Sequence, residues 1–166
     1  GGLGAYATVS ADGPPADPAD AFGGEAMRPQ DTPNVGGAGV RVGGPLAQYV
    51  GSWDRLAARE LDRAWPGHRD PIDDPAGRAG EIRTHHVDRT RRVIEALDDH
   101  GPADTWTVSA RLFGELEEIH ILHGPGEAFA HLEHLERHGI VERDGAEYRL
   151  IDPDPDVPAL FPKTKY

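Results

Sequence analysis

The chain has no cysteine, only two lysines and no long apolar run. Because cysteine is missing, disulfides and thiolate ligands are excluded, and any metal must be held by histidine and carboxylate side chains. No apolar segment approaches the roughly 20 residues that a membrane-spanning helix needs, and no charged-then-apolar leader is visible. We therefore expect a cytoplasmic protein without a membrane partner. The first residue is Gly1 rather than Met, which leaves open that coding sequence lies upstream.

Acidic residues outnumber basic ones by 29 to 17, and the formal net charge is −12. Of the basic residues only Lys163 and Lys165 are lysines. This balance indicates a halophilic protein, since a solvated carboxylate shell keeps proteins soluble in high salt. It also disfavours nucleic acid as a partner, because phosphate backbones require a cationic surface.

The N-terminal half of the chain mixes loop sequence with one clear helix. Residues 1–31 are rich in Gly, Ala, Pro and Asp, and we expect them to be disordered or degenerate. From Pro45 to Ala57 apolar residues recur at three- and four-residue steps, which predicts a helix with one buried stripe. Residues 62–66 are predicted as a short strand and 69–77 as a turn segment.

The C-terminal half predicts a small helical domain with a hairpin. A helix is expected from Ala79 to His100, a short helix ending at Phe113 and capped near Thr107 or Ser109, and a third helix opened by Gly124-Pro125-Gly126. A hairpin with an Asp144-Gly145 turn covers 140–151, and 152–166 form a Pro-broken tail. This order is typical of a winged helix-turn-helix domain. Its expected core is Leu97, Trp106, Leu112, Phe113, Phe129, Leu132, Leu135, Ile140 and Tyr148.

The third helix also carries a polar face. His131, His134 and His138 share it with Glu127, opposite the apolar residues, so we expect that face to be solvated or to lie in an interface. From residue 103 to 151 there are four basic and ten acidic residues, which disfavours DNA binding by this domain.

The segment Ala64-Trp65-Pro66-Gly67-His68 is the most specific motif. Proline fixes φ and glycine permits a sharp bend, so the imidazole of His68 is aimed, as a metal ligand must be. The motif follows the helix at 45–57 and precedes a helix with His85, Arg89 and Arg92. This order, over Pro33 to Ile151, resembles the C-terminal part of metallo-β-lactamase-fold hydrolases of the hydroxyacylglutathione hydrolase-like group, haloarchaeal type.

The resemblance implies an α+β fold in two parts. Residues 32–80 are the C-terminal remnant of a metallo-β-lactamase αββα catalytic domain, and 81–151 are its winged-helix extension, against which His85 and Arg89 dock the catalytic domain. It implies two zinc ions, metal-dependent hydrolysis of a small-molecule thioester or ester, and a homodimer as one possible assembly. His68 matches a ligand of the second zinc, and Glu25 stands where the family has a bridging aspartate. A solvated Glu25 is the open alternative.

The family's His-x-His-x-Asp-His metal motif is absent from the chain. We therefore assign no catalytic residue and expect the chain to be inactive alone, since a dinuclear site needs several ligands around an open position. The competing hypothesis is a winged-helix interaction or regulatory module without catalysis. Finding the His-rich motif upstream of Gly1 would decide for the enzyme.

Overall fold

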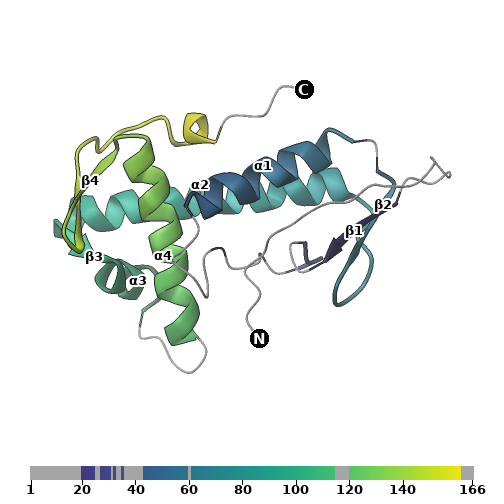
Figure 1. Cartoon of the computed structure of the whole chain (residues 1–166), viewed down its shortest axis with the longest axis horizontal. Coiled ribbons are helices and arrows are strands. Elements are labelled where there is room, and N and C mark those ends of the chain that lie inside the picture. The colour runs from purple at the N-terminus through teal and green to yellow at the C-terminus, as the bar shows by residue number, and fades with distance from the viewer. Residues whose placement is uncertain are drawn as a thin grey trace. The chain divides into compact units, whose positions relative to one another are not determined.

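The computed structural model describes residues 20–24, 27–30, 32, 35, 43–59, 61–114 and 120–161. Helices and strands alternate irregularly along the chain, as expected for an α+β protein (Figure 1). In chain order the elements are β1 (Asp20–Gly24), α1 (Pro45–Ala57), β2 (Arg63–Pro66), α2 (Pro75–His100), β3 (Ala103–Asp104), α3 (Thr105–Phe113), α4 (His120–Arg137), β4 (Val141–Asp144), β5 (Glu147–Leu150) and the 3-10 helix η1 (Val157–Leu160).

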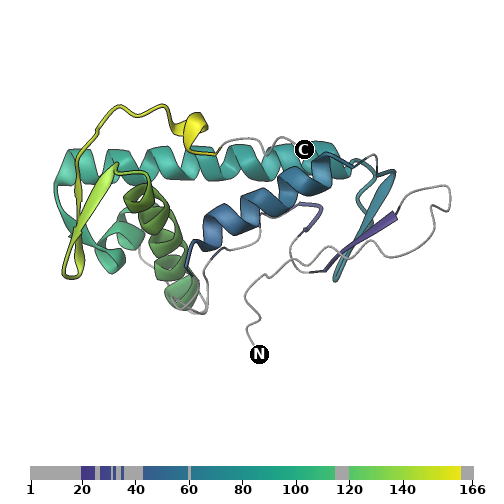
Figure 2. The same cartoon turned by 45° about the horizontal axis from the view of Figure 1, so that its top comes forward.

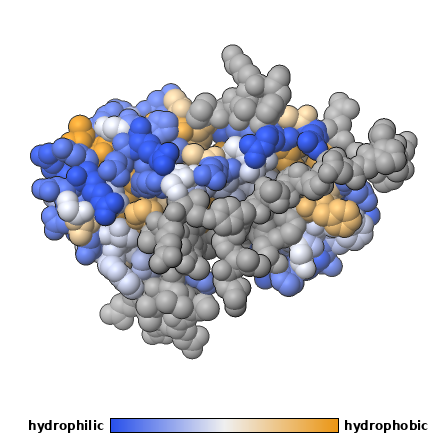
Figure 3. Space-filling model, in the orientation of Figure 1, coloured by the Kyte–Doolittle hydropathy of each residue, from blue (hydrophilic) through white to orange (hydrophobic). Residues whose placement is uncertain are grey.

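The described residues divide into two compact units. The β1–β2 unit contains the described residues up to 32, together with 48–59 and 61–85. The α4 unit contains residue 35, 43–47, 86–114 and 120–161. Most of the coloured surface in Figure 3 is hydrophilic, in keeping with a chain of which 28% is charged. Within the described ranges, no helix is both long enough and apolar enough to cross a membrane.

The β1–β2 unit is built on two parallel strands. Ala21 pairs with Ala64 and Phe22 with Trp65, and Ala64 also forms an antiparallel bridge to Ile72. The C-terminal part of α1 lies beside the first turns of α2 (Figures 1 and 2), where Asp54 and Arg83 form an ion pair of 3.5 Å. The helix predicted at 45–57 is observed with those bounds, because its apolar stripe is buried as the periodicity requires.

Helix α2 begins four residues earlier than predicted, at Pro75. The Asp74 side chain accepts the backbone N–H of Gly77 at 2.8 Å, and Pro75 occupies the first helical position, where its missing N–H costs nothing. The last three residues of the predicted turn segment at 69–77 are therefore helical. The helix ends as expected at His100, and Gly101, which follows it, has a φ of 77°.

In the α4 unit, α3, α4 and the C-terminal part of α2 accompany a small antiparallel sheet with the strand order β3-β5-β4. The predicted hairpin is observed as β4 and β5, with Gly145 at a positive φ of 61° in the turn. Helix α3 begins at Thr105, and its cap is Asp104, whose carboxylate accepts the N–H of Thr107 at 2.8 Å. The predicted caps at Thr107 and Ser109 are wrong because both residues lie inside the helix.

Helix α4 begins at His120, so the prediction that Gly124-Pro125-Gly126 opens it is wrong. Pro125 is the sixth residue of the helix and removes a single backbone hydrogen bond. Gly124 and Gly126 are buried, and α4 packs against α3.

Two expectations about side-chain burial are corrected. Glu127, His131 and His134 are buried, because α4 is covered on that side by α2 and by the segment after β5. Trp106, expected in the core, is 59% exposed on the first turn of α3.

The segment after β5 is packed rather than a loose tail as far as residue 161. Val157 and Phe161 are buried, and η1 forms between them. The His134 ring stacks on Phe161 with centroids 4.5 Å apart, and its Nε2 lies 3.0 Å from the carbonyl oxygen of Leu160. This histidine therefore joins α4 to the C-terminal segment.

Candidate functional site

His68 lies in a loop that is closed at its base. The two backbone hydrogen bonds between Ala64 and Ile72 measure 2.9 and 2.8 Å, and the Arg63–Asp73 ion pair of 2.7 Å lies next to them. Together they fix the ends of the segment between Ala64 and Ile72. His68 is exposed and lies two residues after the end of β2.

The loop contains the one non-glycine residue with positive φ among those the structure describes. Arg69, next to His68, has a φ of 75°. A side chain in this region costs on the order of 1 kcal/mol, and such strain concentrates at functional sites, where the surroundings enforce it. The Pro66-Gly67-His68-Arg69 loop is thus both pinned and strained, as expected for a loop that positions a ligand.

The described residues do not fit a complete zinc site. Over those ranges, no three histidine or carboxylate side chains come close enough together to hold a metal ion. Glu25, the other predicted ligand, lies outside the described residues. A zinc site that includes His68 therefore needs further donors, and we assign no catalytic step to the residues described.

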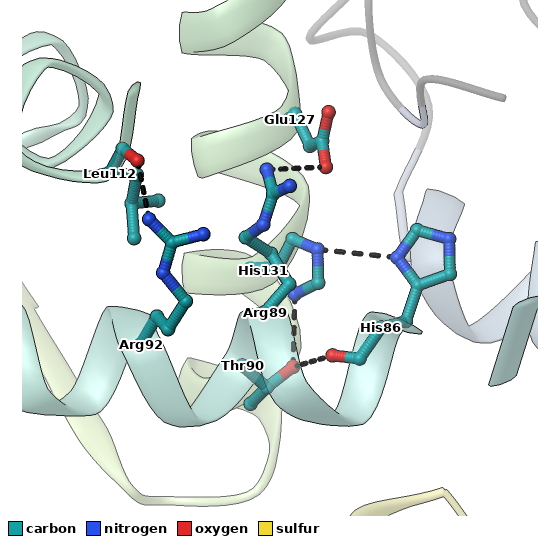
Figure 4. A network of polar contacts seen from close by, with 7 residues as sticks. All are labelled: His86, Arg89, Thr90, Arg92, Leu112, Glu127 and His131. Atoms are coloured by element: carbon teal, nitrogen blue, oxygen red, sulfur yellow. Dashed lines mark hydrogen bonds and ion pairs between the residues drawn. The ribbon is translucent and has the colours of Figure 1, made fainter. Parts of the chain in front are cut away.

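A second polar cluster, which the sequence did not predict, joins α2 to α4 inside the α4 unit (Figure 4). The Thr90 hydroxyl lies 2.8 Å from the carbonyl oxygen of His86 and 2.9 Å from Nδ1 of His131. The Nε2 atom of His131 lies 3.4 Å from Nδ1 of His86, a long hydrogen bond. All three side chains are fully buried.

These contacts fix one proton of the cluster. A carbonyl oxygen only accepts, so the single hydroxyl proton of Thr90 goes to His86, and Nδ1–H of His131 donates to Thr90. Between Nε2 of His131 and Nδ1 of His86 one nitrogen donates and the other accepts, and the geometry suits either direction.

An ion pair lies about one helical turn from the His86–His131 contact, on both α2 and α4. Arg89 Nη1 lies 2.9 Å from Glu127 Oε1, and both side chains are mostly buried (Figure 4). The guanidinium also lies 4.5 Å from the ring centroid of Phe113. Burial lowers the pKa of Arg89, and the Glu127 carboxylate opposes that shift. Arg89, expected to dock the helix on the catalytic domain, thus holds α2 to α3 and α4.

Helix α4 is enclosed along most of its length. No residue from His123 to Leu135 is exposed. Glu133 accepts the backbone N–H of Gly44 at 2.9 Å and also contacts Arg137, so the segment before α1 covers this side of the helix. Among the residues of α4 whose burial the structure describes, only Glu136 and Arg137 in its last turn are exposed.

Solved structures that resemble the chain include two metallo-β-lactamase-type proteins. A metallo-β-lactamase family protein from Thermus thermophilus is 33% identical, with a TM-score of 0.70, over 80% of this chain and 42% of that one. A β-lactamase domain protein from Burkholderia ambifaria is 25% identical, with a TM-score of 0.72 and the same two coverages. No protein-family model matches the sequence, and no curated protein matches it either.

These likenesses support the metallo-β-lactamase fold for the chain. The chain spans less than half the length of each solved neighbour. The activity, substrates and partners of a whole protein of that length are therefore matters for the proposal that follows.

Proposed function

We propose that the chain is the C-terminal part of a metallo-β-lactamase-fold hydrolase of the hydroxyacylglutathione hydrolase-like type. Its complete form would hydrolyse a small-molecule thioester or ester with zinc. The observation that carries the proposal is the 33% identity to a metallo-β-lactamase family protein over 80% of the chain. The pinned, strained loop that presents His68 supports it, because such a loop suits a ligand-bearing turn.

The parallel strands give further support. Gly24 at the end of β1 pairs with Pro66 at the end of β2. The two proposed zinc ligands, Glu25 and His68, follow this pair by one and two residues in the sequence. Ligands of α/β proteins bind beyond the carboxyl ends of the sheet strands, and both residues follow such an end in the sequence. The remaining donors would come from polypeptide that carries the His-x-His-x-Asp-His motif.

For residues 81–151 we propose a winged-helix extension whose role is structural packing and not the binding of nucleic acid. The order of helices and strands and the β3-β5-β4 sheet support the winged-helix assignment. In such a domain α4 would enter the DNA groove, but its side chains from His123 to Leu135 are not exposed. Duplex DNA should therefore show no measurable affinity for the chain in a gel shift at moderate salt, and sub-micromolar binding would contradict this assignment.

A fused protein tests the proposed activity. The part of the Thermus thermophilus protein that this chain does not match is placed upstream of Gly1, and zinc-dependent hydrolysis of a hydroxyacylglutathione thioester is measured. We expect turnover that His68→Ala lowers by about 100-fold or more, because the loss of a ligand exceeds the effect of an outer-shell change. His100→Ala, an exposed histidine at the end of α2, is the matched control and should leave turnover unchanged.

Two results would contradict the proposal. Turnover that is unchanged by His68→Ala would exclude His68 as a ligand of the catalytic zinc site. A folded, zinc-loaded fusion with no hydrolysis would favour the competing hypothesis of an interaction or regulatory module.

A further inference from the structure

The β1–β2 pair has one packed face and one aromatic face. Ala21 and Ala64 pair with each other and are both buried. One residue further along, Phe22 pairs with Trp65, and these side chains are 73% and 38% exposed. Successive side chains of a strand point to opposite faces, so both aromatic rings lie on the face away from the alanines.

Polar groups at the margin of this face hold the Trp65 ring. Its indole N–H donates to the Asp20 carboxylate at 3.1 Å, and the Arg63 guanidinium lies 5.8 Å from the ring centroid. Asp20 and Arg63 are register partners, two residues before the aromatic pair on the same face. An aromatic centre with a polar margin, held in place before binding, is the anatomy of an interface hot spot.

A parallel pair of strands with an open face is unusual. Parallel strands are nearly always covered on both faces, and two strands alone are marginally stable in water. The second edge of β2 is occupied at Ala64 by Ile72. For β1, no strand partner other than β2 occurs in the described part of the chain. In the region where Figure 1 places these strands, Figure 3 shows an apolar area at the surface.

We infer that the Phe22–Trp65 face is the docking surface for the rest of a metallo-β-lactamase-like domain, which covers the aromatic pair and adds strands beside β1. This inference rests on the proposed function. This chain covers 42% of each solved neighbour, so more than half of each has no counterpart here and is long enough to supply such a layer. The face carries one acidic and one basic residue, which suits an apolar, uncharged partner surface. A second copy fits less well, because two chains of charge −12 repel each other.

Hydroxyl-radical footprinting read by mass spectrometry tests the docking surface. Oxidation of Phe22 and Trp65 is compared between the chain alone and the fused protein described above. We expect about fivefold or greater protection of both residues in the fusion, because burial removes most of their accessible area. Trp106 is the matched control: it is 59% exposed in the other unit and should oxidise equally in both proteins.

The outcomes separate the two proposals. Protection of Trp65 in a fusion without hydrolysis leaves the docking surface in place and rejects the proposed activity. Hydrolysis with Trp65 as reactive as in the chain alone rejects the docking surface. Protection that already develops in the chain alone as its concentration rises would identify a second copy as the occupant and overturn the inference.

A variant of the chain alone keeps the inference testable if the fusion does not fold. The change Phe22→Ser, at a side chain that is 73% exposed, should shift the Tm of the chain alone by no more than about 2 °C, because exposed side chains contribute little to the stability of the chain that carries them. The same change made in a folded fusion should lower its Tm clearly. A large loss of stability in the chain alone would mean that the face is already packed, which would refute the inference.

Discussion

The His134→Gln change should remove one part of the acid sensitivity of the α4 unit, the part that comes from this buried histidine. Burial lowers the pKa of His134 from 6.5 to about 4, with smaller contributions from the neighbouring His138 and Arg137. The ring is only 4% exposed, and its Nε2–H donates to the carbonyl oxygen of Leu160. Because the folded pKa lies below the unfolded one, the folded state binds fewer protons, and acid therefore favours unfolding.

The size of the change in unfolding free energy follows from the shift in the pKa of His134. Stability from the neutral ring is fully present above pH 6.5 and is lost as the pH falls to about 4. A difference of about 2.5 pH units at 1.36 kcal/mol each gives about 3 kcal/mol. Glutamine keeps an N–H donor near Leu160 but does not titrate, so His134→Gln should flatten the pH profile by that amount.

Urea unfolding at pH 4, 5, 6 and 7 measures this difference in the free energy of unfolding. Comparing the full chain with its variant cancels the contribution of the other histidines, including the buried pair His86 and His131. His100→Gln, at an exposed position, is the control and should leave the profile of the natural chain unchanged. Parallel profiles for the natural chain and His134→Gln would refute the account of this buried histidine.

Three further changes test how the α4 unit is held together. Leu132→Ala should cost about 2–5 kcal/mol in urea unfolding, because the side chain is fully buried; a cost below about 1 kcal/mol would contradict its place in the core. Asp104→Ala should cost about 1 kcal/mol by removing the cap of α3, whereas Asp98→Ala, on the exposed surface of α2, should be near neutral. Glu127→Gln should cost about 3 kcal/mol because it leaves the Arg89 charge buried. Adding Arg89→Met to the same chain should recover part of that loss. If the losses of unfolding free energy in the two single variants simply add in the double variant, the proposed coupling between the two side chains is excluded.

The sequence predicted the elements better than their ends. Apolar periodicity at 45–57 and alternation at 140–151 each reflect one buried side, and such patterns survive in any tertiary context. The starts of α2 and α3 depend on single carboxylates, Asp74 and Asp104. Both were visible in the sequence as an aspartate before Pro75 and an aspartate before Thr105, and both are ordinary helix-start signals.

The polar face of α4 could not be predicted by the same logic. Apolar periodicity identifies the buried face only when a single side of the helix is covered, but α4 is covered on several sides. The contact between His86 and His131 joins residues 45 apart in the chain, and no local pattern encodes it. The loop of His68 was predicted from its proline and glycine, whereas the strain at Arg69 emerges only from the closure of the loop by Ala64 and Ile72.

The most direct test of the central claim is the zinc affinity of the fused protein, measured by competition with a chelator, with His68 present and with His68→Ala. Because we propose that His68 is one ligand of a site completed by other polypeptide, one zinc ion should bind at least about tenfold more weakly in the variant. His100→Ala should bind zinc as the unchanged fusion does. Equal zinc stoichiometry and affinity with and without the His68 imidazole would contradict the claim that this chain contributes a ligand to a metallo-β-lactamase-type site.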